Sequence, residues 1–128
     1  MIQNDTTPHR LIGAVQELLQ RFDANLPSVP EHPTVDDMDP WRERIDIIDR
    51  ALVQIMNERV KCANVIGAIK KKLGMPVYVP SREEEVLRNV IEGNTGPLSD
   101  EAVRRLFERI IDETRSEERH RYQDPDPS

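Results

Sequence analysis

The sequence predicts an all-α protein built from amphipathic helices. Its apolar residues recur at helical steps of three and four over long stretches. Charged residues make up 33% of the 128 residues and aromatic residues 4%. These proportions are typical of a helical bundle with a solvated exterior rather than of a sheet sandwich. The length suits one modest domain.

The longest predicted helix runs from about Pro40 to Leu73, and Gly74 ends it with Pro76 just beyond. It carries one apolar stripe at helical spacing, formed by Trp41, Ile45, Ile48, Leu52, Ile55, Cys62, Ile66, Ile69 and Leu73. We expect this stripe, Cys62 included, to be buried. A helix of this length is unusual in a globular domain, which indicates packing against another chain.

Arg59 occupies a position of this stripe where a hydrophobic residue is expected. A guanidinium keeps its charge, so its burial is costly unless anions meet it. Either an internal glutamate pairs with Arg59, or the bundle surrounds an anionic ligand. Lys70 follows eleven residues later on nearly the same side of the helix. The two residues are about 16 Å apart along the axis, so their long side chains could reach one small dianion.

Arg42 shares its flanking heptad position with Lys70. On a straight helix it lies about 42 Å from Lys70, so one chain cannot bring both to one ligand. An antiparallel two-fold partner could, since the start of its helix would lie near the end of this one. The alternative is that Arg42 and Lys70 are simply solvated.

Shorter helices flank the principal one. An N-terminal extension, residues 1–38, is predicted to hold a short helix over about 8–24, begun by Thr7-Pro8, and an extended, proline-rich linker over about 26–38. The helical domain then covers 39–122, and the tail over 123–128 is predicted to be disordered.

Two more helices complete the domain. Ser81 with Glu84 predicts a capping box that opens the second, which Gly93 ends. Ser99 caps the third.

Polar residues interrupt the inner faces of these helices as well. Thr114 and Glu118 continue the apolar face of the third helix at helical spacing, unless that end frays into solvent. Arg82 and Glu83 lie in the first turn of the second helix. An arginine there opposes the helix dipole, which indicates a role other than stability.

Composition excludes several classes of function. A net charge of −6 argues against general affinity for nucleic acids or acidic membranes, and the basic run at 70–72 suits a helix end. A single cysteine argues against disulfides and for a reducing, cytoplasmic location. The sequence shows no signal-peptide pattern, no apolar run of membrane-spanning length, no glycine-rich phosphate loop and no metal-spaced His/Cys cluster.

One ordered set of short motifs spans roughly residues 39–118. It consists of Trp41-Arg42-Glu43-Arg44-Ile45-Asp46, Ile48-Asp49, Glu58-Arg59, Ile66-Gly67, Ile69-Lys70, Pro76-Val77-Tyr78, Ser81-Arg82-Glu83, Gly96-Pro97-Leu98-Ser99, Leu106-Phe107 and Ile110-Ile111. This set resembles the all-helical chorismate mutases. The resemblance implies a three-helix protomer in an intertwined helical homodimer, here with an extra N-terminal amphipathic helix. Each active site of that family borrows one arginine from the partner.

The resemblance also implies roles for individual residues. Arg42 would be the borrowed arginine, and Arg59 would bind a substrate carboxylate. Lys70 would donate to the ether oxygen and a carboxylate. Arg82 would approach the other carboxylate, and Glu83 would accept from the ring hydroxyl.

Four further positions complete the implied site. Thr114 matches a family serine, and Glu118 lies where members carry glutamine or glutamate. Ile66 and Ile111 would contact the substrate.

The implied reaction is the pericyclic conversion of chorismate to prephenate in aromatic amino-acid biosynthesis, without cofactor, metal or nucleophile. Such an enzyme holds a flexible dianion in a compact conformer and places positive charge at the breaking C–O bond.

Two departures from the family pattern leave alternatives open. Val79 stands where an aspartate near the ring hydroxyl is common. Glu118 must be protonated to donate to the ether oxygen; burial raises its pKa, Arg59 and Lys70 lower it, and the sequence does not decide between them. We hypothesise that turnover favours acidic pH.

The same scaffold also resembles 4-amino-4-deoxychorismate mutases and isochorismate-pyruvate lyases, and a non-catalytic regulatory module is a further alternative. The N-terminal helix either packs on its own dimer or docks to another shikimate-pathway enzyme.

Overall fold

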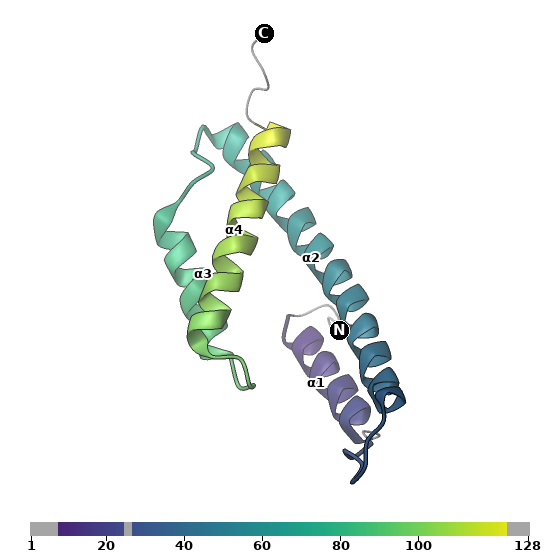
Figure 1. The fold of residues 1–128 in the computed structure, drawn as a ribbon. Helices are drawn as coiled ribbons and strands as arrows, with labels where there is room; N and C mark the ends of the chain where they lie inside the picture. Colours follow the sequence, from purple (N-terminus) through teal and green to yellow (C-terminus); the bar gives the residue numbers. More distant parts are fainter. Residues whose placement is uncertain (1–7, 25–26, 123–128) are drawn as a thin grey trace, which may run out of the picture. The chain divides into compact units, whose positions relative to one another are not determined.

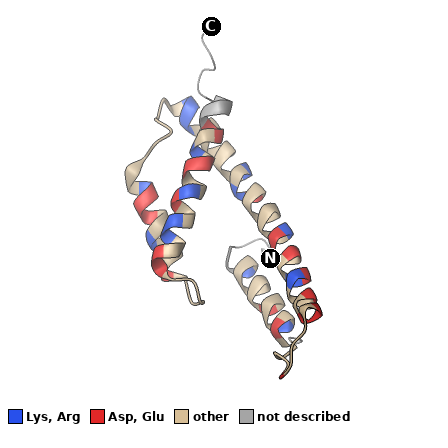
Figure 2. Cartoon of the chain, in the orientation of Figure 1, with Lys and Arg blue, Asp and Glu red and all other residues tan. Residues whose placement is uncertain are grey.

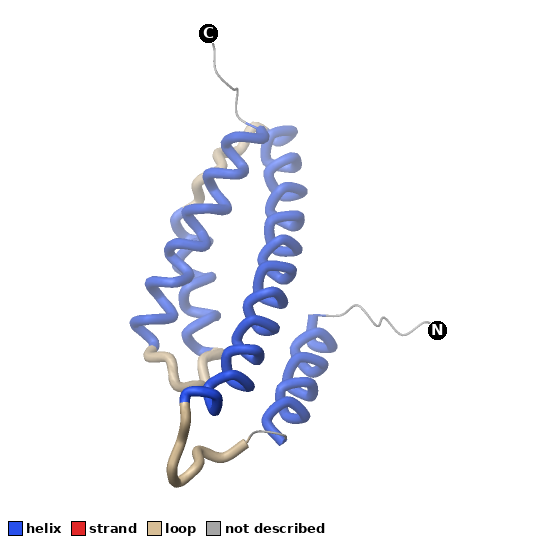
Figure 3. Tube along the Cα trace, turned by 45° about the vertical axis from the view of Figure 1, so that its right-hand side comes forward, coloured by secondary structure: helices blue, strands red, loops and turns tan. Residues whose placement is uncertain are grey.

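The computed structural model describes residues 8–24 and 27–122. In chain order its elements are α1 (Pro8–Ala24), the 3-10 helix η1 (Val35–Met38), α2 (Asp39–Leu73), α3 (Pro80–Glu92) and α4 (Asp100–Tyr122), as Figure 1 shows. Within the described ranges every regular element is a helix (Figure 3), which confirms the all-α class. The expected cap at Thr7 and the tail at 123–128 lie outside the described residues.

The chain divides into two compact units, one ending at Asp46 and the other beginning at Ile47. In the first unit, α1 contacts the start of α2 through Arg44. The Arg44 guanidinium carbon lies 3.4 Å from the centroid of the Phe22 ring, and its Nη2 pairs with Asp23 Oδ1 at 3.3 Å. A cation over an aromatic face is attracted by the ring quadrupole, so this contact attaches α1 to α2.

The sequence predicts an extended linker between α1 and α2, but the structure shows that the linker is not extended throughout. Its last residues form the single turn η1, because Asp37 Oδ2 accepts a hydrogen bond of 2.7 Å from the backbone N–H of Thr34. This local acceptor satisfies a donor that the start of the turn would otherwise leave free.

The carboxyl end of α2 is where the sequence predicts it. Gly74 adopts a φ of 70°, the left-handed region that glycine enters without strain. The N–H of Gly74 donates to the carbonyl of Lys71 at 3.2 Å, and that of Met75 to the carbonyl of Lys70 at 2.9 Å. These are the two bonds of a Schellman motif, which stops the helix and turns the chain toward α3.

The predicted capping box at the start of α3 is wrong. The N-cap is Val79, whose carbonyl accepts from the N–H groups of Arg82 and Glu83 at 3.1 and 3.2 Å. Pro80 occupies the first helical position, where its fixed φ suits the helix and its missing N–H costs nothing, so α3 begins before Ser81. The helix ends at Gly93, as predicted.

The predicted cap of α4 is confirmed. Ser99 Oγ accepts from the backbone N–H of Ala102 at 3.0 Å, and the Ser99 carbonyl accepts from the N–H of Val103 at 3.0 Å. Both groups of one residue thus satisfy donors of the first turn.

In the second unit α3 packs against α4, and the core consists of Leu87, Val103 and Ile111. The apolar stripe of α2 is not buried in the single chain. In this unit six members of the stripe are at least 39% exposed, namely Ile48, Leu52, Ile55, Ile66, Ile69 and Leu73. Cys62, another member of the stripe, is exposed as well in the single chain. Gly67 is the only residue of α2 that is buried, so within the described residues the apolar stripe lacks a full cover.

Acidic and basic residues are interspersed along α4 and the first part of α2, while the last turn of α2 is basic (Figure 2). None of the helices in the described ranges combines the length and apolar character that crossing a membrane requires.

Candidate active site

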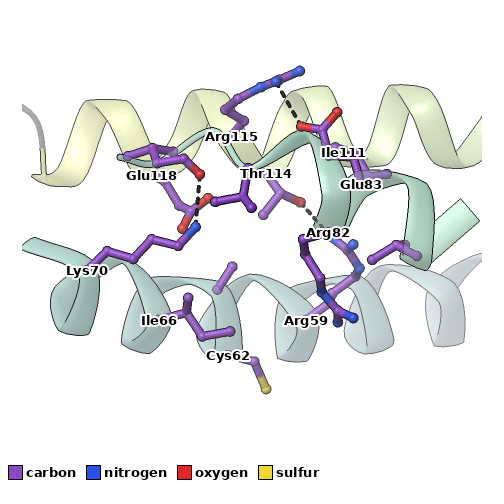
Figure 4. A pocket seen from close by; sticks show the side chains of 14 residues that line it. Arg59, Cys62, Ile66, Lys70, Arg82, Glu83, Ile111, Thr114, Arg115 and Glu118 are labelled. Atoms are coloured by element: carbon purple, nitrogen blue, oxygen red, sulfur yellow. Dashed lines mark hydrogen bonds and ion pairs between the residues drawn. The ribbon is translucent and has the colours of Figure 1, made fainter. Parts of the chain in front are cut away.

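The second unit contains a cavity of about 400 Å³ between α2, the loop before α3, α3 and α4 (Figure 4). Its walls include every predicted site residue except Arg42. These residues are Arg59, Ile66, Lys70, Val79, Arg82, Glu83, Ile111, Thr114 and Glu118. Residues that are up to 59 positions apart in the sequence therefore share one cavity.

Arg59 reaches the cavity from α2 and is held by α4. Its Nη1 donates to Thr114 Oγ1 at 2.8 Å, and that hydroxyl donates to the carbonyl of Ile110 at 2.8 Å. Burial lowers the pKa of Arg59, the nearby Arg82 lowers it further, and Glu118 opposes both. In the described part of the chain, no carboxylate lies within ion-pair distance of Arg59. The structure therefore does not show the ion pair with an internal glutamate that was one of the two expectations for Arg59.

Lys70 and Arg82 bring two further cations to the cavity walls. Lys70 Nζ donates to the carbonyl of Val77 at 2.8 Å, on the loop that joins α2 to α3. The Arg82 side chain is exposed and pairs with Glu85 across one turn of α3, with Nη1 to Oε1 at 2.6 Å. An exposed pair of this kind is weak, so Arg82 can exchange it for an anionic ligand.

Among the described residues of the second unit, Glu118 is the residue with an ionisable side chain that is buried, and 7% of it is exposed. Burial raises its pKa, and Lys70, Arg115 and Arg59 partly offset that rise, in this order. The direction that the sequence left open is thus decided by desolvation. A protonated carboxyl group has an O–H to donate, which an ionised one lacks.

Arg115 also lines the cavity, and sequence reasoning missed it. Its Nη1 donates to Glu83 Oε2 at 2.8 Å, and its Nη2 pairs with Asp112 Oδ1 at 2.6 Å. Figure 4 shows the Arg115–Glu83 contact beside the cavity. The only signal in the sequence was its position next to Thr114, which is too weak because a charge on a helix is usually solvated. The other lining residues that were not predicted are Cys62, Ala63, Val77 and Val86.

Arg42 lies elsewhere, exposed on the part of α2 that belongs to the first unit. It lines an apolar groove with Val29, Met38, Trp41 and Ile45. Within one chain the cavity therefore contains no contribution from Arg42.

The cavity combines cations with apolar walls. Arg59, Lys70 and Arg82 supply positive charge, while Ile66 and Ile111 supply apolar surface. The described residues contain no cluster of His, Cys, Asp and Glu that could hold a metal ion. Such an arrangement suits a compact organic anion whose carboxylates meet arginine and whose carbon skeleton meets isoleucine.

The fold and this site define a helical protein with a cavity whose cations and apolar walls suit a small organic anion. The family of chorismate mutase type II matches residues 41–119, and the chain belongs to this family. The family expected from the motifs is thereby confirmed.

Two curated relatives are bifunctional chorismate mutase/prephenate dehydratases. The protein of Neisseria gonorrhoeae is 42% identical over 80 residues, which are 62% of this chain and 22% of the relative. That of Aquifex aeolicus is 33% identical over 81 residues, 60% of this chain and 22% of the relative. The chain thus spans 22% of the length of each of these proteins.

A solved structure shares the fold. The chorismate mutase (form II) of Thermus thermophilus is 32% identical, with a TM-score of 0.65 over 68% of this chain and 99% of that chain.

Proposed function

We propose that this protein is a chorismate mutase that converts chorismate to prephenate. The observation that carries the proposal is the state of Arg59, which lies in the cavity wall, bonded to a neutral hydroxyl and, among the described residues, without a carboxylate partner. A half-buried guanidinium in this state is prepared for an anion from outside the chain. Membership of the chorismate mutase type II family supports chorismate as that anion.

Binding would fold the substrate as well as hold it. Chorismate carries two carboxylates, one on the ring and one on the enolpyruvyl side chain. Arg59 takes one and Arg82, released from Glu85, takes the other, while Ile66 and Ile111 contact the carbon skeleton. Holding both ends of a flexible dianion keeps the two carbons that will bond close together, which lowers the entropic part of the barrier.

The chemical step breaks the ether C–O bond as a new C–C bond forms, with no group lost or gained. Negative charge develops on the ether oxygen in the transition state. Lys70 and Glu118 line the same cavity; Lys70 donates a hydrogen bond to that oxygen, and so does Glu118 in its protonated form, which burial favours. Donors that are already in place stabilise developing charge without reorganisation.

The active unit in this proposal is a homodimer. The exposed apolar stripe of α2 needs a cover, and a second copy of α2 running antiparallel supplies one. The same arrangement brings Arg42 of the partner subunit to the cavity as a further cation. This agrees with the absence of Arg42 from the single-chain cavity.

The cellular setting follows from the same chemistry. We place the protein in the cytoplasm, in aromatic amino-acid biosynthesis, because its single cysteine, Cys62, is a free thiol, and a free thiol persists in a reducing compartment. The exposed residues Leu11, Ile12, Leu18 and Leu19 on α1 are available either to the dimer or to another shikimate-pathway enzyme.

A product assay tests the proposed function. The protein is incubated separately with chorismate, isochorismate and 4-amino-4-deoxychorismate, and the products are identified by chromatography and mass. We expect prephenate from chorismate as the main product. The amino analogue is the relevant competitor, since Val79 lines the cavity where an aspartate is common in the family. Preferred turnover of that analogue or of isochorismate would contradict the proposal.

A further inference from the structure

Arg115 lies at the meeting point of α4, α3 and the loop before α3. Its guanidinium group donates to Glu83 of α3 and to Asp112 one turn earlier on α4. The guanidinium carbon lies 4.7 Å from the centroid of the Tyr78 ring. Only 21% of the Arg115 side chain and 27% of the Glu83 side chain are exposed, so this pair is shielded from water more than the other ion pairs of α3 and α4.

These contacts occupy the groups with which an arginine binds an anion. Both terminal nitrogens have carboxylate partners, and one face lies against the tyrosine ring. The third nitrogen, Nε, is buried and has no partner among the described residues. Arg115 therefore does not offer a free fork to a substrate carboxylate, although it lines the cavity.

Glu83 is the residue on which this arrangement acts. Its carboxylate lies in the first turn of α3, directly after the cation Arg82, and shares the cavity with Arg59. A glutamate side chain has several rotatable bonds, so Glu83 could turn toward Arg82 or toward Arg59. The contact between Arg115 Nη1 and Glu83 Oε2, at 2.8 Å, fixes one oxygen and leaves Oε1 available.

We propose that Arg115 is a positioning residue that aims Glu83 at the ring hydroxyl of the substrate and keeps it away from the cations that bind the carboxylates. The inference rests on the proposed mutase function. Val79 makes the constraint more important, since this end of the cavity has no second carboxylate at that position. Losing Arg115 has two costs: the hydroxyl loses an oriented acceptor, and a freed Glu83 competes with the substrate for Arg82 and Arg59.

A double-mutant cycle between Arg115 and Glu83 tests the proposal in the full-length protein. The variants are Arg115→Ala, Glu83→Ala and the two combined, with kcat and KM for chorismate measured for each. We expect Arg115→Ala to lower kcat/KM by ~10- to 100-fold, the size of effect that misplacement of a reacting group by about 1 Å produces. In the Glu83→Ala background the same change should cost less than about threefold, because the carboxylate that Arg115 holds is already removed.

Arg115→Lys provides the rescue, since a lysine keeps one hydrogen bond to Glu83 but loses the fork. It should recover part of the activity, and it remains informative if Arg115→Ala does not fold. The matched control is Arg109→Ala, which removes an exposed arginine of α4 that pairs with Glu113. We expect that control to keep kcat and KM unchanged.

A chorismate analogue that lacks the ring hydroxyl gives an independent readout. With this analogue, Arg115→Ala and the wild type should differ less than with chorismate, because a hydroxyl acceptor no longer matters. Equal losses with both compounds, or additive losses in the double-mutant cycle, would overturn the role of Arg115 while leaving the mutase function intact. Absence of prephenate formation by the wild type would instead contradict the proposed function, and this inference with it.

Discussion

The Arg59 guanidinium donates to the Thr114 hydroxyl at 2.8 Å and thereby connects α2 to α4 across the cavity. The hydroxyl donates its own hydrogen to the carbonyl of Ile110, so its acceptor lone pairs face the arginine. This partner orients the guanidinium without neutralising it. Arg59 keeps its full charge for a ligand, in a position that is half-buried and costly to leave unpaired.

Replacing Arg59 with alanine should abolish mutase activity. The variant loses a charge-assisted contact to a substrate carboxylate, and a loss of ~10²- to 10³-fold in kcat/KM is expected for one such group in a shielded site. Steady-state kinetics with chorismate measures the loss, and far-UV circular dichroism should report an unchanged helical signal.

The matched control for Arg59 is Lys61→Ala, two residues along α2. Lys61 is exposed and pairs with Glu58 within the helix, with Nζ to Oε2 at 2.6 Å. We expect this variant to keep the wild-type rate. If Arg59→Ala stayed active while folded, the assignment of the carboxylate site to Arg59 would be wrong.

The pH dependence of turnover should follow the protonation of Glu118. Burial raises the pKa of Glu118, so its neutral, donating form persists to higher pH than that of an ordinary glutamate. As the pH rises through that raised pKa, the donor is lost and kcat should fall. Glu118→Gln keeps an N–H donor at all pH values and should flatten the profile. An identical pH–rate profile for the two proteins would contradict this role.

Stability gives a second view of Glu118. Its folded-state pKa lies above that of the unfolded chain, so between these two values the folded state binds more protons. Stability is therefore lost as the pH rises from the unfolded to the folded pKa, and the loss persists above both. Thermal unfolding across pH should show that Glu118→Gln raises the Tm at neutral pH relative to the wild type, and does so less in acid. A Tm difference that is the same at all pH values would argue against burial of the charge as its cause.

Subunit mixing tests the borrowed arginine. Arg42→Ala and Arg59→Ala homodimers should each be inactive. In a mixed dimer one site combines both defects and the other site has neither. When the two variants are unfolded together and refolded, about half of the dimers are mixed, and each mixed dimer has one intact site. The mixture should therefore recover about a quarter of the wild-type activity. Refolding each variant alone is the control. A mixture without any recovered activity would contradict a site shared between subunits.

The attachment of α1 should depend on the Arg44–Phe22 contact. Phe22→Ala removes the ring beneath the guanidinium, which contributes ~0.5 to 1 kcal/mol at a partly exposed site. Hydrogen exchange of the amides over residues 10–24 should become faster, while exchange in α3 and α4 stays the same. Gln16→Ala, at an exposed polar position of the same helix, is the control. Unchanged exchange in the Phe22 variant would show that α1 is held by other contacts.

Local signals predicted the elements well. Gly74 ends α2 and Ser99 caps α4 where the sequence indicates, because both effects depend on neighbouring backbone groups only. The cap of α3 was wrong because Ser81 and Glu84 match a pattern that Pro80 overrides by starting the helix earlier. Cys62 is exposed in the single chain, which the sequence does not reveal, since periodicity identifies an apolar face but not whether the same chain covers it.

The sequence by itself determined the helices, the anomalous charge at Arg59 and the family, because these follow from residue spacing along one chain. Only the tertiary structure decided which atoms meet. It placed Thr114 rather than a glutamate against Arg59, joined Arg115 to Glu83, and buried Glu118 deeply enough for desolvation to outweigh three nearby cations. Each of these outcomes depends on side chains from different helices, whose distances and shielding from water no spacing along the chain reveals.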